Sequence, residues 1–333
     1  MLDIVRLPAD DLEDVVLATA GKLGLQPAIV EKDLWVCYLL DYLFQRSEFA
    51  NGIVFKGGTS LSKAYGLINR FSEDVDLIID WRLLGYGLNE PWEPRSNSAQ
   101  ERFKKEAAER TEHFLGEVFA PAIRDGISAE LGFEADMRLG SDAETVVFAY
   151  PKRHSSAATL EAVRLEIGPL AAWSPSAPAA ISPYVAEAYP KAFPAARTSV
   201  KTVKPERTFW EKATILHQEA NRPEAKALPR RYSRHYYDMY QLGHSPVLEA
   251  ALAQPALLER VVEFKERFYR TPWARLSEAK PGSLRLVPPA GRQAELRRDY
   301  AAMRPMLFGK CPSFDEVIAY TAELEQRINP NDC

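Results

Sequence analysis

The spacing of apolar and polar residues divides this chain into a mixed α/β front part and a helical rear part. Apolar residues recur at helical intervals in residues 11–45, which predicts two helices, and the apolar run at 75–80 is typical of a buried strand. Similar patterns predict strands at 53–55, 144–150, 160–168 and 198–203, and helices at 60–69, 99–127, 205–220, 230–243, 247–270 and 289–328. We therefore expect an α/β domain over residues 1–203 and a mostly helical domain over residues 204–333.

Two stretches of the front part add detail to this picture. The strands at 144–150 and 160–168 are separated by a short polar segment, which predicts a hairpin. Residues 169–205 are rich in Pro, Ala and Ser, and we expect an irregular connection there, apart from the strand at 198–203.

Composition excludes several classes of protein. The 333 residues are 46% hydrophobic and 26% charged, as in a globular protein, and no apolar run approaches the roughly 18 residues of a membrane helix. The N-terminus lacks a signal-like apolar core, so we expect a cytoplasmic protein without a membrane partner. Cys37, Cys311 and Cys333 lack the spacing of a zinc site or a disulfide framework. Because the net charge is −4, any contact with RNA requires a local basic patch.

The stretch VFKGGTSLSKAYGLINRFSEDVDLIID, residues 54–80, carries most of the chemistry. Gly57 and Gly58 follow a strand and precede a helix, and the amides of the next residues would point outward at the start of that helix. Such a turn attracts phosphate, to which the Ser60 hydroxyl and the charge of Lys56 or Lys63 could contribute. The alternative is an ordinary turn between a strand and a helix.

Asp74 and Asp76 stand two residues apart at the entrance of the second strand, so their side chains point to the same face. Two neighbouring carboxylates repel each other unless a cation lies between them, and Mg²⁺ prefers such oxygen ligands together with substrate phosphates. This pattern predicts a metal pair, and a solvated acidic loop is the alternative. Glu166 could supply a third carboxylate, or it could pair with Arg164 on its own strand.

Two features of the rear part could complete the site. Lys212 borders the apolar stripe of its helix and could reach a triphosphate, while Asp238 could orient Lys212, assist a metal or accept a proton. A buried structural pair is the alternative.

Basic residues interleaved with aromatic residues suit nucleic acid, although a charged helix entrance is the commoner explanation. The residues of this cluster are Lys226, Arg230, Arg231, Tyr232, Arg234, His235, Tyr236 and Tyr237.

These segments together resemble the AbiEii/AbiGii toxin family of nucleotidyltransferases, which includes the MenT toxins. The resemblance rests on VEKDLWV, FKGGTSLSKAYGLINRFSEDVDL, PERTFWEKATILHQ and SRHYYDMYQL, and less sharply on GSLRLVPP and MLFGKCPSFDEV. It implies a polymerase β-like nucleotidyltransferase fold, with a small mixed sheet followed by a helical C-terminal region.

The resemblance also implies roles for particular residues. It places nucleotide binding at the glycine turn, metal binding at Asp74 and Asp76, and further catalytic side chains at Lys212 and Asp238. Ser72 matches a position close to the active site in MenT-like toxins, and a phosphate there would oppose nucleotide binding. The full set predicted to bind the nucleotide is Lys56, Gly57, Gly58, Thr59, Ser60, Lys63 and Ser72.

The leading hypothesis is a toxin that uses Mg²⁺ or Mn²⁺ to transfer a nucleoside monophosphate from an NTP to an acceptor hydroxyl. The resemblance implies the 3′ end of a tRNA as acceptor and a cognate antitoxin as partner, in a toxin–antitoxin or phage-defence system. One alternative is transfer to a hydroxyl of a protein or a small molecule, which would not need the basic-aromatic cluster. A non-catalytic nucleotide-binding module is the other, and the two intact aspartates count against it.

Overall fold

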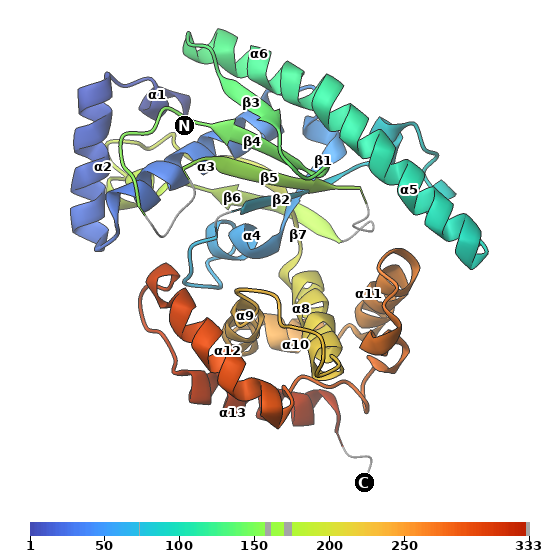
Figure 1. The fold of residues 1–333 in the computed structure, drawn as a ribbon. Helices are drawn as coiled ribbons and strands as arrows, with labels where there is room; N and C mark the ends of the chain where they lie inside the picture. The colour runs from blue at the N-terminus through green and yellow to red at the C-terminus, as the bar shows by residue number, and fades with distance from the viewer. Residues whose placement is uncertain (73, 157–160, 170–174, 331–333) are drawn as a thin grey trace. The chain divides into compact units, whose positions relative to one another are not determined.

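A computed structural model describes residues 1–72, 74–156, 161–169 and 175–330 (Figure 1). The chain forms two units, each with its own core. The first unit contains Met1–Tyr65, Ser72–Ala171 and Ser176–Val203, and the second contains Gly66–Phe71, Ala172–Pro175 and Lys204–Cys333. The second unit therefore includes a short segment that lies, in sequence, between two elements of the first.

The first unit is built on a seven-stranded mixed sheet, as far as the described residues show, in the order β3-β4-β5-β2-β1-β7-β6. The central strand β2 pairs antiparallel with β1 and parallel with β5, and β1 pairs parallel with β7. The outer pairs are all antiparallel. The strands are β1 Ile53–Lys56, β2 Asp74–Ile79, β3 Asp136–Leu139, β4 Thr145–Ala149, β5 Val163–Gly168, β6 Ser176–Ile181 and β7 Thr198–Val203.

Helix α3 forms the core of this unit. Its residues are apolar on almost every side and nearly all are buried, because the helix packs on β5 and β7 and is covered by other helices. Trp35 of α3 meets Phe148 of β4 edge to face, with ring centroids 5.9 Å apart. The helices are α1 Leu2–Val5, α2 Ala9–Leu23, α3 Pro27–Gln45, α4 Gly57–Lys63, α5 Asn97–His113, α6 Ala120–Leu131 and α7 Tyr184–Ala188.

Helices α5 and α6 form one continuous rod in Figure 1. A π-helical segment, Phe114–Phe119, joins them without a break, and Phe114, Leu115 and Phe119 of this segment are buried. The sequence pattern predicted this region as a single long helix, which agrees with the continuous rod.

The second unit is helical and is organised around α8, which packs against α9, α10 and α11. Phe209 and Trp210 of α8 are buried, and the Trp210 indole donates a hydrogen bond to the Ala251 carbonyl. The helices are α8 Pro205–Ala220, α9 Arg234–Gly243, α10 Val247–Leu252, α11 Pro255–Phe268, α12 Ala290–Met303 and α13 Phe314–Ile328. Of the helices in the described part of the chain, none has both the length and the apolar character to cross a membrane.

The predicted α/β architecture, with a mixed sheet followed by a helical region, is confirmed, and so is the β4–β5 hairpin. The prediction of an irregular segment at 169–205 is wrong for β6, which pairs along its whole length with β7, while residues 170–174 lie outside the described residues. An Ala- and Pro-containing sequence gives no strand pattern, and β6 is an edge strand, where a proline is tolerated. The helix predicted at 60–69 begins earlier, at Gly57, and ends at Lys63.

Candidate functional site

Charged side chains line one face of the central sheet in the first unit. The strand register places Lys56 opposite Asp76, and Asp76 opposite Glu166. One step along the strands, Asp74 is opposite Arg164. Because cross-strand partners and residues two apart share a face, all five side chains belong to the same face. The alternate residues of these strands are apolar and buried on the other face, so the fold holds this charged group on a rigid support.

Gly57 brings the backbone against the carboxylate of Asp76. It follows the last residue of β1, and its φ of +81° lies in the region that glycine adopts without strain. A Cβ atom at this position would lie 1.9 Å from Oδ2 of Asp76. The glycine is therefore required twice, once for the backbone conformation and once for the space that Asp76 occupies.

We expect Gly57→Ala to destabilise the protein by about 2 kcal/mol or more, because the methyl group adds a steric clash to the strain of a left-handed backbone. Gly132→Ala is the matched control, since Gly132 has a φ of +74° but no atom within 4 Å of its Cβ position. Urea denaturation of both variants measures the difference. Equal losses of stability would contradict the steric role of Asp76.

The two hydroxyl groups of the glycine turn are used inside the protein. Thr59 Oγ1 donates to the carbonyl of Asp74 at 2.5 Å, and Ser60 Oγ donates to the carbonyl of Gly57 at 2.9 Å. Both side chains are buried. Thr59 thus ties α4 to the start of β2, and Ser60 closes the turn at Gly57. A role for Thr59, Ser60 or Gly58 in phosphate binding stays a prediction.

Lys63 has a carboxylate partner within its own unit. Its Nζ lies 2.9 Å from Oδ1 of Asp33 and 3.4 Å from Oε1 of Glu187, and the side chain is only 5% exposed. Burial opposes the charged ammonium, but the attraction of Asp33 together with smaller contributions from its other neighbours outweighs burial, so the pKa of Lys63 is raised. The charge of Lys63 is therefore neutralised by the protein itself. Lys56, which is half-buried and opposite Asp76, is better placed to face a ligand.

The charged face fits a divalent metal in the type of its donor atoms. Carboxylate oxygens such as those of Asp74 and Asp76 are the ligands that Mg²⁺ prefers, and Mg²⁺ is commonly held by one or two carboxylates plus substrate phosphates. Within the described ranges, no group of three or more His, Cys, Asp or Glu side chains is arranged to hold a metal ion. Arg164 lies 3.7 Å from carboxylate oxygens of both Asp74 and Glu166, so the Arg164–Glu166 pairing is present. Metal binding by Glu166 stays a prediction.

The second unit contains a buried group of two cations around one carboxylate. Arg70 binds Asp238 through two parallel bonds, Nε to Oδ1 at 2.7 Å and Nη2 to Oδ2 at 2.9 Å. Lys212 Nζ donates to the same Oδ2 at 2.6 Å. All three side chains are at least 90% buried. The structure thus brings the predicted residues Lys212 and Asp238 together and adds Arg70.

The charges in this group decide its protonation. Burial alone would raise the pKa of Asp238, but Arg70 and Lys212 outweigh it and hold the pKa well below its ordinary value. Since both oxygens of Asp238 already accept hydrogen bonds, this residue is suited to orienting cations rather than to accepting a proton. Burial lowers the pKa of Lys212, and burial together with Lys212 and Arg234 lowers the pKa of His235 well below its usual value.

Arg70 is the member of this buried group that sequence reasoning missed. Its segment crosses into the second unit, where Phe71 N donates to the carbonyl of Met306 and Phe308 N donates to the carbonyl of Asn69. A signal was present, because Arg70 stands within the RFSEDVD motif, four residues before Asp74. Spacing along one strand could not reveal that its partner is 168 residues away.

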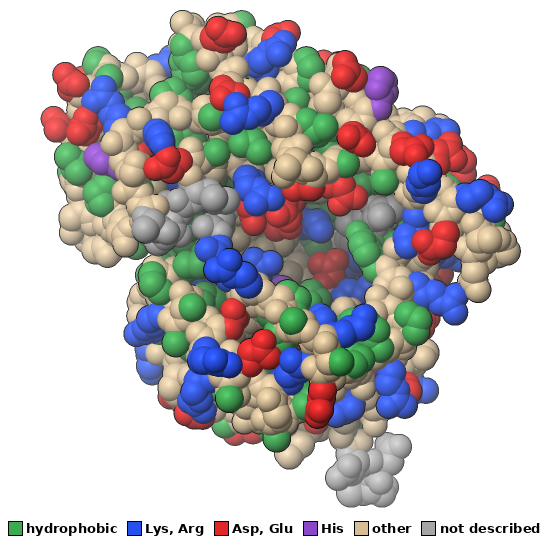
Figure 2. All heavy atoms as spheres, in the orientation of Figure 1, with side chains coloured by type: hydrophobic (Ala, Val, Ile, Leu, Met, Phe, Trp, Pro, Cys, Tyr) green, Lys and Arg blue, Asp and Glu red, His purple; other side chains and the backbone are tan. Residues whose placement is uncertain are grey.

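The predicted basic-aromatic cluster divides into buried, half-buried and exposed members, with Tyr232 and Arg234 half-buried. Tyr236 and Tyr237 are buried in the core of the second unit, and so is His235. The exposed members are Lys226, Arg230 and Arg231, on the connection between α8 and α9. On the face shown in Figure 2, acidic and basic side chains are interspersed, in keeping with the net charge of −4.

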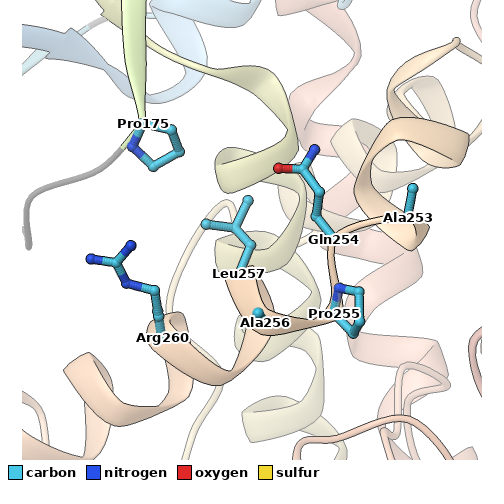
Figure 3. Close-up of a pocket in the computed structure, with 7 residues that line it drawn as sticks. All are labelled: Pro175, Ala253, Gln254, Pro255, Ala256, Leu257 and Arg260. Atoms are coloured by element: carbon cyan, nitrogen blue, oxygen red, sulfur yellow. The ribbon is translucent and has the colours of Figure 1, made fainter.

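One cavity of about 650 Å³ lies in the second unit, beside the connection between α10 and α11 (Figure 3). Its lining contains none of the residues predicted from the sequence to act in the site. The lining residues are Pro175, Ala253, Gln254, Pro255, Ala256, Leu257 and Arg260. The residues predicted from the sequence to act in the site therefore lie outside this cavity.

The chain was compared with protein families, with solved structures and with curated proteins. Residues 38–320 match the family model described as nucleotidyl transferase AbiEii toxin, type IV toxin–antitoxin system. Among solved structures, MenT4, a nucleotidyltransferase toxin from Mycobacterium tuberculosis H37Rv, is similar with 17% sequence identity and a TM-score of 0.43, over 94% of this chain and 99% of that chain. A comparison with curated proteins finds no match.

Proposed function

Because this chain belongs to the AbiEii family of nucleotidyltransferase toxins, we propose that it transfers a nucleoside monophosphate from an NTP to a hydroxyl at the 3′ end of a tRNA. Membership in this family makes the chain a nucleotidyltransferase of a type IV toxin–antitoxin system, with an NTP as substrate and an antitoxin as partner. The acceptor, the metal and the individual residue roles are parts of our proposal.

The observation that carries the proposal is the placement of Asp74 and Asp76 on one face of β2, with Gly57 directly against Asp76. Two carboxylates beside a glycine turn suit a metal-bound triphosphate, since the backbone can approach the phosphates there. A bound Mg²⁺ or Mn²⁺ would neutralise charge that develops on the phosphoryl oxygens. In the proposed site Asp74 and Asp76 hold the metal, with Glu166 as a third carboxylate, and Lys56 faces the phosphates.

The buried cations of the second unit have a part in the same proposal. Lys212 would contact the triphosphate, while Asp238, itself held by Arg70, fixes the Lys212 ammonium group in place. The chemical support is the surplus of positive charge, because Arg70 and Lys212 share the single carboxylate of Asp238. The sequence adds that Arg70 precedes Asp74 by only four residues. In the sequence Ser72 stands between Arg70 and Asp74, and in the proposed site it would be close to the nucleotide.

The test is to incubate the protein with each labelled NTP, Mg²⁺ and total tRNA, and to follow the label in RNA, protein and small molecules. We expect label at the RNA 3′ end, with release of pyrophosphate. Label in protein or in a small molecule instead would favour the alternative acceptors. If no RNA is labelled under conditions in which the protein inhibits growth, the proposed acceptor is wrong. Calorimetry with Mg-NTP tests whether the chain binds the substrate at all. Absence of binding would count against a catalyst.

A further inference from the structure

We propose that the connection between α8 and α9, residues 221–233, is a preformed binding surface for the phosphate backbone of the acceptor RNA, and that Asp299 and Arg292 of α12 are its positioning residues. The inference rests on the proposed RNA acceptor and adds the element that would bind it. All of the residues concerned belong to the second unit.

The connection is long and exposed, yet it is held in one conformation. It contains thirteen residues, and connections of that length without regular structure are commonly functional. Its exposed side chains include Lys226, Arg230 and Arg231. Arg222 does not belong to this set, because it is half-buried. Its guanidinium donates to both carboxylate oxygens of Glu219, at 2.6 and 2.8 Å. The connection therefore presents basic side chains on an ordered backbone.

Helix α12 holds the connection at both ends. Nη2 of Arg292 donates to the carbonyls of Pro223, Glu224 and Lys226 at 2.9, 2.8 and 2.6 Å. Seven residues later, and so on the same face of α12, Asp299 accepts hydrogen bonds at the other end of the connection. Its partners are the amides of Arg231 and Ser233 and the Ser233 hydroxyl, at 2.6, 2.8 and 2.6 Å.

The hydrogen bonds of Arg292 and Asp299 form a clamp on residues 221–233, and this clamp stabilises a backbone conformation that would otherwise be unfavourable. Arg231 has a φ of +60°, and within the described part of the chain Arg275 is the only other non-glycine residue with a positive φ. Such a conformation persists only where surrounding contacts enforce it, and it is typical of binding sites. The Arg231 amide is one of the donors to Asp299, so the contact that enforces the strain also directs this arginine.

The chemistry of this surface favours a nucleic-acid backbone. Lysine and arginine side chains neutralise phosphates by releasing counterions, which makes the affinity depend on salt. An ordered surface binds more tightly than a mobile one with the same charges, because less entropy is lost on binding. Lys226 Nζ also lies 5.4 Å from the ring centroid of Trp273, which places an aromatic side chain beside the basic connection.

The experiment measures binding of a fluorescent RNA hairpin with a single-stranded 3′ end, without NTP or divalent metal, over a series of salt concentrations. For the variant Lys226→Ala/Arg230→Ala/Arg231→Ala we expect at least about tenfold weaker binding, and a slope of log affinity against log salt reduced by about 2. These side chains are exposed, so the variant should fold normally. An unchanged slope, or no binding of RNA by the native protein, would overturn the proposal.

Asp299→Asn tests the positioning role with opposite expectations. Removing a negative charge should by itself strengthen RNA binding, whereas loss of the clamp should weaken it about three- to tenfold, because the amide places a donor against the donors of Ser233. Glu259→Gln, an exposed acid on α11, is the matched control and should bind RNA at least as tightly as the native protein. Unchanged or tighter binding by Asp299→Asn would refute the clamp.

Two additions keep the test decisive. Ser233→Ala removes only one bond of the clamp and should have a smaller effect in the same direction, which covers the case in which Asp299→Asn does not fold. Polyglutamate serves as a second probe. If the protein binds polyglutamate but does not bind the RNA hairpin, the surface would be assigned to an acidic protein instead. Because RNA binding is measured without nucleotide transfer, this proposal and the proposed function can fail separately. If RNA is labelled although the variants bind RNA normally, the binding surface alone is contradicted. If the variants lose RNA binding although the label goes to another acceptor, the proposed acceptor alone is contradicted.

Discussion

Asp76→Asn is expected to lower the rate of nucleotide transfer by about a thousandfold or more, which corresponds to ~4 kcal/mol of lost transition-state stabilisation. The amide keeps the shape of the side chain beside Gly57 but removes the negative charge that a divalent metal requires. The measurement is the initial rate of labelled NMP incorporation into RNA, with the urea midpoint as a check of folding.

Asp136→Asn is the matched control for this prediction. Asp136 is an exposed aspartate on β3 of the same sheet, and its carboxylate pairs with Arg138 rather than with the charged face. The control should transfer nucleotides at the native rate. Transfer by Asp76→Asn within tenfold of the native rate would exclude Asp76 as a metal ligand. Direct titration with Mn²⁺ would then show whether Asp74 binds metal without it.

Asp238→Asn should destabilise the second unit by about 3–5 kcal/mol, because it leaves Arg70 and Lys212 buried without their counter-charge. The expected result is a large drop in the denaturation midpoint of the unit, measured by near-ultraviolet circular dichroism in urea. Asp315→Asn is the control, since its carboxylate is exposed and pairs with Arg297 on the surface of the same unit. That change should leave the denaturation midpoint close to the native value, because exposed ion pairs contribute little to stability.

The stability that Asp238 contributes depends on pH in a definite direction. Its pKa in the folded protein is lowered, so the contribution is complete above the ordinary aspartate pKa and is lost as the pH falls toward the folded-state value. The native protein should therefore lose more stability in acid than Asp238→Asn does. Parallel acid dependence in the two proteins would show that this carboxylate does not carry the effect.

The features of the candidate site that depend on neighbouring residues in the chain were predictable from the sequence. Gly57 follows the strand that pairs with the strand of Asp76, and both the glycine turn and the spacing of Asp74 and Asp76 are local patterns. Strand periodicity likewise places the two aspartates on one face before any partner strand is known. Elements with strong periodicity, such as α3 and β2, were predicted for the same reason.

Tertiary structure decided the partners. Lys63 looked available for a phosphate, yet folding buries it against Asp33, and Arg70 joins Asp238 across 168 positions of the chain. The clamp of Asp299 and Arg292 on residues 221–233 is equally invisible in the sequence. Periodicity determines which face a side chain occupies, because the backbone repeats locally. Which charge neutralises which depends on burial and distance between remote segments, and only the folded chain fixes these.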